Sequence, residues 1–293
     1  MKEDKLENLK GAGVALTTPF TEDNSVDFTS LKKLVKHVID GGIDFIVALG
    51  TTSEAVTLSK EERKAVVKCI IDETNNRVPI VMGLGGNNTA EVLNTINTTD
   101  FTGIDAILSV LPYYNKPQQD GIYYHFTEIA KASPVPIILY NVPGRTSSNI
   151  LPETVIRLAN KNANIIAIKE ASGDLEQCME IIKNTPKDFF LLSGDDKLTL
   201  PIVACGGAGV ISVIANAYPG EFSKMVRLMK EGAINEAQQI HYQLLDIISA
   251  IFEDGNPAGI KAVLSIKGIM ENRLRLPLVK VNDTVSHKIS KLI

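Results

Sequence analysis

The sequence predicts a (β/α)8 barrel followed by a small C-terminal helical domain. Eight short apolar runs alternate with longer amphipathic stretches, the pattern of buried strands each followed by a helix. Eight such units in one chain favour a closed parallel barrel. The main competitor is a doubly wound open sheet. That fold would usually carry a nucleotide-binding fingerprint, and the sequence has no full GxGxxG or GxxxxGK motif.

The expected elements follow from these runs and from signals at helix starts. The predicted strands are Gly13–Thr17, Phe45–Ala48, Pro79–Met82, Ala106–Val110, Pro136–Tyr140, Ile165–Lys169, Phe190–Leu192 and Gly209–Val213. The helices are expected to begin near Asp27, Ser59, Thr89, Pro117, Pro152, Asp174, Asp196 and Pro219. Ser59 and Glu62 have the spacing of a capping box, and Pro152 and Pro219 suit a first helical turn.

The length of 293 residues leaves about 60 residues after the eighth unit. We therefore expect a barrel domain over residues 1–231 and a helical domain over residues 232–293. Ala237–Phe252 and Pro257–Lys267 are the two amphipathic stretches that predict helices in the second domain.

Composition predicts a soluble cytoplasmic protein without a nucleic-acid or membrane partner. The net charge of −4 argues against a nucleic-acid footprint, and the charged N-terminus lacks the apolar core of a signal peptide. No apolar run approaches the roughly 18 residues that a membrane span needs. Three scattered cysteines form no CxxC pair and no zinc pattern, so we expect reduced thiols and no metal site.

A lysine closes the sixth predicted strand, where barrels place their active sites. Strand alternation puts Ile165, Ala167 and Lys169 on one face, and if this face is the barrel interior, Lys169 enters a poorly hydrated space. Such a space disfavours the ammonium, and attack on a ketone requires the neutral amine. The alternative is a lysine that extends to the rim without a role.

Three other strand ends, those of the second, fourth and fifth strands, carry reactive side chains. After the fourth strand, Tyr113 and Tyr114 lie in a stiff loop between two prolines; they are either surface aromatics buried by an oligomer or part of the site. Tyr140 closes the fifth strand, so its phenol should share a cavity with Lys169 and could carry protons, although it could also simply pack the barrel mouth. Gly50-Thr51-Thr52 offers backbone N–H groups and hydroxyls that can hold a carboxylate, or it is an ordinary turn. Arg145 could grip a carboxylate bidentately, or it is a solvated loop residue.

Taken together, the motifs are far more specific than any one of them. They are Gly50-Thr51-Thr52-x-Glu54, Tyr113-Tyr114-Asn115, Tyr140-Asn141-Val142-Pro143-x-Arg145-Thr146, Ile168-Lys169-Glu170 and Ser193-Gly194-Asp195-Asp196. In this order they resemble the dihydrodipicolinate synthases of the N-acetylneuraminate lyase superfamily of class I aldolases. The resemblance covers essentially the whole chain.

The resemblance implies a condensation of pyruvate with L-aspartate 4-semialdehyde, in the biosynthesis of lysine and diaminopimelate, that needs no cofactor. Lys169 would form the imine, and Tyr140, Thr51 and Tyr114 would relay protons. Tyr114 would reach in from a neighbouring subunit of a homo-oligomer, expected to be a dimer of dimers, that is, a homotetramer. Thr52, Arg145 and the backbone at Gly194 and Ile211 would bind the substrates.

Two alternatives remain open at this point. One is another pyruvate aldolase, such as an N-acetylneuraminate or 2-keto-3-deoxy-sugar-acid lyase. The Asn-Val-Pro-x-Arg-Thr context of Arg145 favours the synthase. The other is a non-enzymatic binding protein on the same barrel, against which the Lys169 and Tyr140 pair argues.

Two further expectations concern details of the resemblance. Asn87, Glu91 and Tyr113 match an L-lysine effector site at the dimer interface, but Ala55, Lys60 and Arg63 depart from the strongly inhibited pattern, so we expect at most weak inhibition. We place Asn87 and Glu91 on one helical face, four residues apart. Position 53 is Ser where the family turn most often has Gly, and a positive φ there would strain it.

Overall fold

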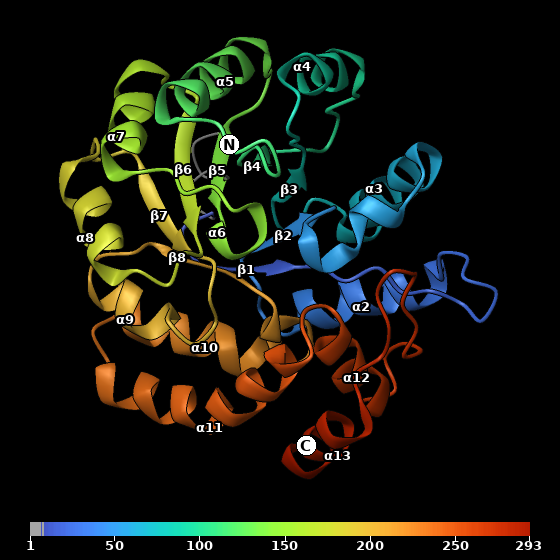
Figure 1. Ribbon diagram of the computed structural model, residues 1–293. Helices are drawn as coiled ribbons and strands as arrows, with labels where there is room; N and C mark the ends of the chain where they lie inside the picture. Colours follow the sequence, from blue (N-terminus) through green and yellow to red (C-terminus); the bar gives the residue numbers. More distant parts are fainter. Residues whose placement is uncertain (1–6, 8) are drawn as a thin grey trace.

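A computed structural model describes residue 7 and residues 9–293, and its strands form one closed parallel barrel in the order β1 to β8 (Figure 1). The strands are β1 (Ala12–Ala15), β2 (Phe45–Ala48), β3 (Ile80–Gly83), β4 (Ala106–Val110), β5 (Ile137–Asn141), β6 (Ile165–Glu170), β7 (Phe190–Ser193) and β8 (Gly209–Ser212). The predicted fold class is confirmed, and each predicted strand lies within two residues of an observed one.

Helices surround the barrel and follow its strands (Figure 1). They are α2 (Phe28–Asp40), α3 (Lys60–Thr74), α4 (Thr89–Thr98), α5 (Gln119–Ala132), α6 (Pro143–Thr146), α7 (Pro152–Lys161), α8 (Leu175–Asn184), α9 (Thr199–Ala204) and α10 (Pro219–Lys230). Ser59 and Glu62 make both hydrogen bonds of the predicted capping box before α3. Pro152 and Pro219 stand in the first turns of α7 and α10, as expected.

The helix expected near Asp196 begins later, at Thr199, because Asp196 has another structural task. Its buried carboxylate accepts hydrogen bonds from the backbone N–H groups of Val213, at 3.1 Å, and Ile214, at 2.8 Å. These bonds fix the chain where it leaves β8. Burial raises the pKa of Asp196 to about 6, although the hydrogen bonds oppose that shift.

Two layers of buried apolar side chains stabilise the barrel. The inner layer fills its interior and includes Val47, Ile138, Tyr140, Ala167 and Ile211. The outer layer joins the strands to the helices and extends into the C-terminal segment. Alternate residues of the strands thus pack in different layers, as a filled barrel requires, except at the irregularity in β6.

One sequence expectation about β6 is wrong. Ile165 does not share the inner face with Ala167, because it packs in the outer layer. The register against β5 shifts between Ile137, which pairs with Ile165, and Ile138, which pairs with Ala167. Ile166 is therefore an extra residue, and such an irregularity reverses the inward and outward assignment on its far side.

The C-terminal segment forms three helices: α11 (Ile234–Glu253), α12 (Ala258–Ile266) and α13 (Asp283–Leu292). α11 packs on α10, and α12 packs on both α11 and α13. In Figure 1 these helices (orange to red) lie outside the ring of barrel helices. The two predicted helices are confirmed, α6 and α13 were not predicted, and the division at residue 231 stays a prediction.

Within the described part of the chain, no helix combines the length and the apolar character that crossing a membrane demands.

Candidate active site

Lys169 and Tyr140 lie side by side on the inner face of the barrel, near its carboxyl end. The register of β5 and β6 pairs the two residues directly. The Lys169 Nζ atom lies 4.3 Å from the centre of the Tyr140 ring. Both side chains are buried, with 5% and 7% of their surfaces exposed. The amine and the phenol therefore occupy one poorly hydrated space, as the strand order predicts.

The next residue, Glu170, points away from this space and anchors the end of β6. Its buried carboxylate accepts hydrogen bonds from Asn141 Nδ2 at 2.9 Å, Gln177 Nε2 at 2.9 Å and the Ser172 N–H at 2.7 Å. Burial raises the pKa of Glu170, and these hydrogen bonds oppose the rise. The bonds tie β6 to β5 and α8, so they limit movement of the strand that carries Lys169.

Gly194 and Ile211 border the same space from β7 and β8. A methyl group on Gly194 would stand 3.1 Å from Lys169 Cε and 2.6 Å from the Ala171 side chain. Only a glycine lets the backbone pass this close to the lysine. Ile211 is 1% exposed and belongs to the same inner layer as Tyr140.

The Gly50-Thr51-Thr52 segment forms a tight turn after β2. Thr51 begins the short 3-10 helix η1 (Thr51–Ser53) and is exposed, whereas Thr52 is buried. Ser53 does not have the positive φ that would have strained a serine in this turn. The left-handed residues are instead Leu49, with a φ of 56°, and Glu54, with a φ of 55°. The Ser53 hydroxyl donates to the Gly50 carbonyl at 2.7 Å, which fits serine to this turn.

Arg145 and Tyr114 lie on the rim. Arg145 is exposed at the short helix α6, and its Nη2 atom donates to the Asn256 carbonyl at 3.3 Å. The Tyr114 side chain is 87% exposed and its φ is 73°. A large aromatic group held outward in this way is free to be covered by another copy of the chain.

Two of the three residues predicted for the effector site, Asn87 and Tyr113, are hydrogen-bonded to each other. Asn87 Nδ2 donates to the Tyr113 carbonyl at 3.1 Å, and Asn115 Nδ2 donates to the Asn87 carbonyl at 2.9 Å. Glu91 is exposed in the first turn of α4. The placement of Asn87 and Glu91 on one helical face is wrong, because α4 is capped by Asn88 and Asn87 precedes the helix.

Sequence reasoning missed two residues that contact the Thr51–Thr52 turn. Asn256 Nδ2 donates to Thr52 Oγ1 at 3.0 Å, and Lys261 forms a fully buried ion pair with Glu54. One signal was available: Lys261 interrupts the apolar run Ala258-Gly-Ile-Lys-Ala-Val-Leu, much as Lys169 ends an apolar strand.

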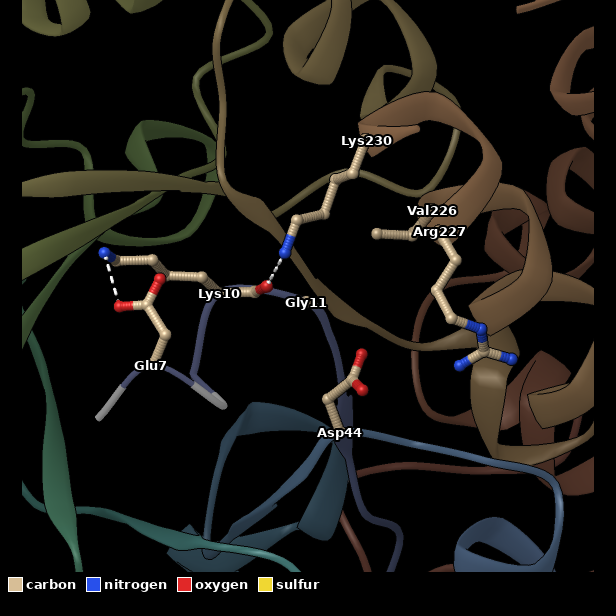
Figure 2. Close-up of a pocket in the computed structure, with 7 residues that line it drawn as sticks. All are labelled: Glu7, Lys10, Gly11, Asp44, Val226, Arg227 and Lys230. Carbon is tan, nitrogen blue, oxygen red and sulfur yellow. Dashed lines mark hydrogen bonds and ion pairs between the residues drawn. The ribbon is translucent and has the colours of Figure 1, made fainter. Parts of the chain in front are cut away.

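A cavity of about 300 Å³ lies at the other end of the barrel (Figure 2). Gly11 and Asp44, which line it, precede β1 and β2, and the Lys230 ammonium donates to the Lys10 carbonyl at its edge. It is therefore separate from the lysine and tyrosine pair. Among the residues that the structure describes, no group of three or more His, Cys, Asp or Glu side chains is placed to hold a metal ion.

Comparison with known proteins decides the family. The model of the dihydrodipicolinate synthetase family matches residues 8–293. The chain belongs to this family. The resemblance drawn from the five motifs is thereby confirmed.

Relatives within the dihydrodipicolinate synthetase family match over nearly their whole length. A 4-hydroxy-tetrahydrodipicolinate synthase of Flavobacterium psychrophilum is 54% identical over 95% of each chain. Among solved structures, a monomeric dihydrodipicolinate synthase variant has a TM-score of 0.95 at 34% identity, over 99% of this chain and 97% of that one. The enzyme of Cyanidioschyzon merolae with lysine bound has a TM-score of 0.92 at 38% identity, over 96% of each chain.

Proposed function

We propose that this chain is a Schiff-base lyase that condenses pyruvate with L-aspartate 4-semialdehyde to give 4-hydroxy-tetrahydrodipicolinate. The observation that carries the proposal is the pairing of Lys169 with Tyr140, with Nζ 4.3 Å from the ring centre in a buried space. An amine in such a space can attack a ketone, and a phenol beside it can move the protons that imine formation requires.

The reaction proceeds through covalent intermediates on Lys169. The amine attacks C2 of pyruvate, and the resulting carbinolamine loses water to give an iminium. The iminium withdraws electrons from C3, which loses a proton to form an enamine. The enamine carbon bonds to the aldehyde carbon of the semialdehyde. The semialdehyde amine then closes the ring on C2 and releases Lys169. The iminium itself is the electron sink, so the chemistry calls for no cofactor.

Separate groups bind the two carboxylates. The backbone and hydroxyls of Thr51 and Thr52 hold the pyruvate carboxylate, and Arg145 holds that of the semialdehyde. The backbone at Gly194 and Ile211 lines the pyruvate site. The close approach of Gly194 to Lys169 supports this assignment, as does the exposure of Arg145 toward the mouth.

Tyr140, Thr51 and Tyr114 relay the protons, with Tyr114 supplied by a neighbouring subunit. The 87% exposure of Tyr114 and the 84% exposure of Val56 support a surface that a second copy covers. We infer a homo-oligomer built as a dimer of dimers. We also place the enzyme in the cytoplasm, where its three free cysteines stay reduced.

L-lysine is the proposed effector, at a site formed by Asn87, Glu91 and Tyr113. The hydrogen bond from Asn87 to Tyr113 supports the grouping. Arg63, however, is already bonded to the Ala55 carbonyl at 2.9 Å. We therefore expect weak or partial inhibition. Calorimetric titration with L-lysine, with Glu91→Ala as the control, tests this, and tight binding with complete inhibition would contradict it.

A parallel assay tests the activity itself. Purified protein is given pyruvate with L-aspartate 4-semialdehyde in one set and sugar acids of the N-acetylneuraminate and 2-keto-3-deoxy classes in another. The proposal predicts rapid condensation in the first set and little cleavage in the second. The reverse result would identify a sugar-acid lyase, and no turnover in either set would favour a binding protein.

A further inference from the structure

A segment about 200 residues later in the chain holds the turn that carries Thr51 and Thr52. Asn256, Lys261 and Arg275 contact this turn, and we call them the C-terminal clamp. Asn256 Nδ2 donates to Thr52 Oγ1 at 3.0 Å. Lys261 pairs with the Glu54 carboxylate, and the Arg275 N–H donates to the same carboxylate at 3.0 Å. The turn is therefore fixed from outside its own βα unit.

Glu54 needs such an anchor. Its φ of 55° and ψ of 33° are left-handed, a conformation that costs energy for any residue with a side chain. Glu54 ends the 3-10 helix η1 and begins the next, η2 (Ala55–Thr57), so its conformation sets the direction of both. Its side chain is fully buried, and the two bonds from the clamp hold it in place.

Lys261 is buried to the same extent. Its ammonium also donates to the Arg273 carbonyl at 2.9 Å and lies 4.2 Å from the centre of the Phe20 ring. Burial lowers the pKa of Lys261 to about 8, and the Glu54 carboxylate opposes that shift. A buried ion pair is often no more stabilising than apolar residues of the same volume, so stability alone is a poor reason for it.

The pair lies directly beside the groups that bind substrate carboxylates. Asn256, two residues before α12, bonds Thr52 through its side chain and accepts from Arg145 through its carbonyl at 3.3 Å. The Arg145 contact uses the backbone carbonyl of Asn256, whereas the Thr52 contact uses its side chain. The side chain of Asn256 thus hydrogen-bonds the turn that is proposed to bind pyruvate.

We propose that the buried Glu54–Lys261 pair is a positioning device that makes α12 part of the pyruvate-binding site. The pair holds Glu54 in its left-handed conformation. This conformation aims the N–H groups and hydroxyls of Thr51 and Thr52 at the pyruvate carboxylate. The inference rests on the proposed function, since it assigns that turn to pyruvate.

The decisive variant removes both charges and keeps the volume: Glu54→Gln with Lys261→Met. Borohydride trapping at increasing pyruvate concentration reports imine formation, and circular dichroism reports the fold. We expect a folded protein whose half-saturating pyruvate concentration rises tenfold or more. Its KM for the semialdehyde should change less than threefold. The matched control, Asp72→Asn with Lys68→Met, removes an exposed ion pair on α3 and should leave both values unchanged.

A folded double variant with unchanged pyruvate dependence would overturn the inference. If the double variant does not fold, Asn256→Ala decides, because it separates Thr52 from the clamp without exposing a buried charge. It should raise the half-saturating pyruvate concentration at least threefold, and an unchanged value would equally overturn the inference. Failure of the wild-type protein to be trapped at Lys169 would instead overturn the proposed function.

Discussion

At the scale of single residues, the proposed catalysis depends on the contact between two side chains. Lys169 and Tyr140 were predictable as neighbours, because consecutive strands of a parallel barrel place their last inward residues at one height. Asn256 was not predictable, since it reaches Thr52 across 204 positions of sequence. Polar contacts made through the tertiary fold leave little trace in the local pattern.

Replacing Tyr140 by Phe removes the phenol and keeps the ring over Lys169. Because Tyr140 is proposed to move protons during imine formation, we expect turnover to fall by about 100-fold or more, the scale of losing a positioned acid–base. The fold should persist, since the ring still packs in the inner layer. Steady-state kinetics and circular dichroism measure the two effects. Turnover within threefold of wild type would show that the phenol only packs the mouth.

At the scale of elements, the apolar runs predicted the positions of the strands well, but they did not predict the irregular pairing of β5 with β6. The register shift at Ile166 follows from pairing with β5, which no property of the run itself reveals. Lys261 was missed because a lysine in an amphipathic helix is ordinarily solvated. The Ser59 capping box was predictable, because all its bonds are local.

At Gly194, just after β7, the backbone passes so close to Lys169 that a side chain has no room. In Gly194→Ala the new methyl group would lie 2.6 Å from the Ala171 side chain and 3.1 Å from Lys169 Cε, so the chain after β7 or after β6 must shift. We expect the rate of imine formation to fall by about 10- to 100-fold, the usual effect of misplacing a reacting group by about 1 Å. Gly220→Ala is the matched control, since its nearest neighbour is 3.8 Å away. Equal trapping rates in the two variants would contradict this role.

The start of α3 is fastened to the C-terminal segment by Glu62 and Arg275, whose side chains are 30% and 16% exposed. The hydrogen bonds from Arg275 lower the pKa of Glu62 to about 2. Its contribution to stability is therefore complete above its ordinary pKa of 4.5 and is lost as the pH falls toward 2.

Glu62→Gln should accordingly lower the free energy of unfolding at pH 7 by about 1 to 2 kcal/mol, a charge-assisted pair reduced for partial solvent screening. The difference from wild type should shrink at pH 3. Urea unfolding at both pH values measures it, with Asp72→Asn in an exposed pair as the control. A difference that does not depend on pH would mean that Glu62 acts through packing.

At the scale of the whole molecule, the barrel strands carry the proposed catalytic pair, and α12 contacts the turn that is proposed to bind pyruvate. The order of eight βα units was sufficient to predict the closed barrel. The contacts of α12 with the mouth could not be predicted, because nothing in the helix sequence says which surface it covers. In the proposed oligomer, Tyr114 of a neighbouring subunit would add one more group to each site.

Two inactive variants test whether Tyr114 acts across an interface. Lys169→Ala and Tyr114→Phe are mixed under conditions in which subunits exchange. Mixed dimers should regain activity, because one site in each pairs an intact Lys169 with an intact Tyr114. Exchange itself is followed by mass spectrometry of the intact assembly. If exchange is complete and activity does not return, Tyr114 serves the site of its own chain.

The most direct measurement of the central claim is chemical trapping at Lys169. The protein is incubated with pyruvate, reduced with borohydride and digested, and the peptides are weighed. We expect the mass of reduced pyruvate on the peptide that contains Lys169, and no such adduct in Lys169→Ala, which should also be inactive. An adduct at a different lysine, with activity retained in Lys169→Ala, would contradict the assignment.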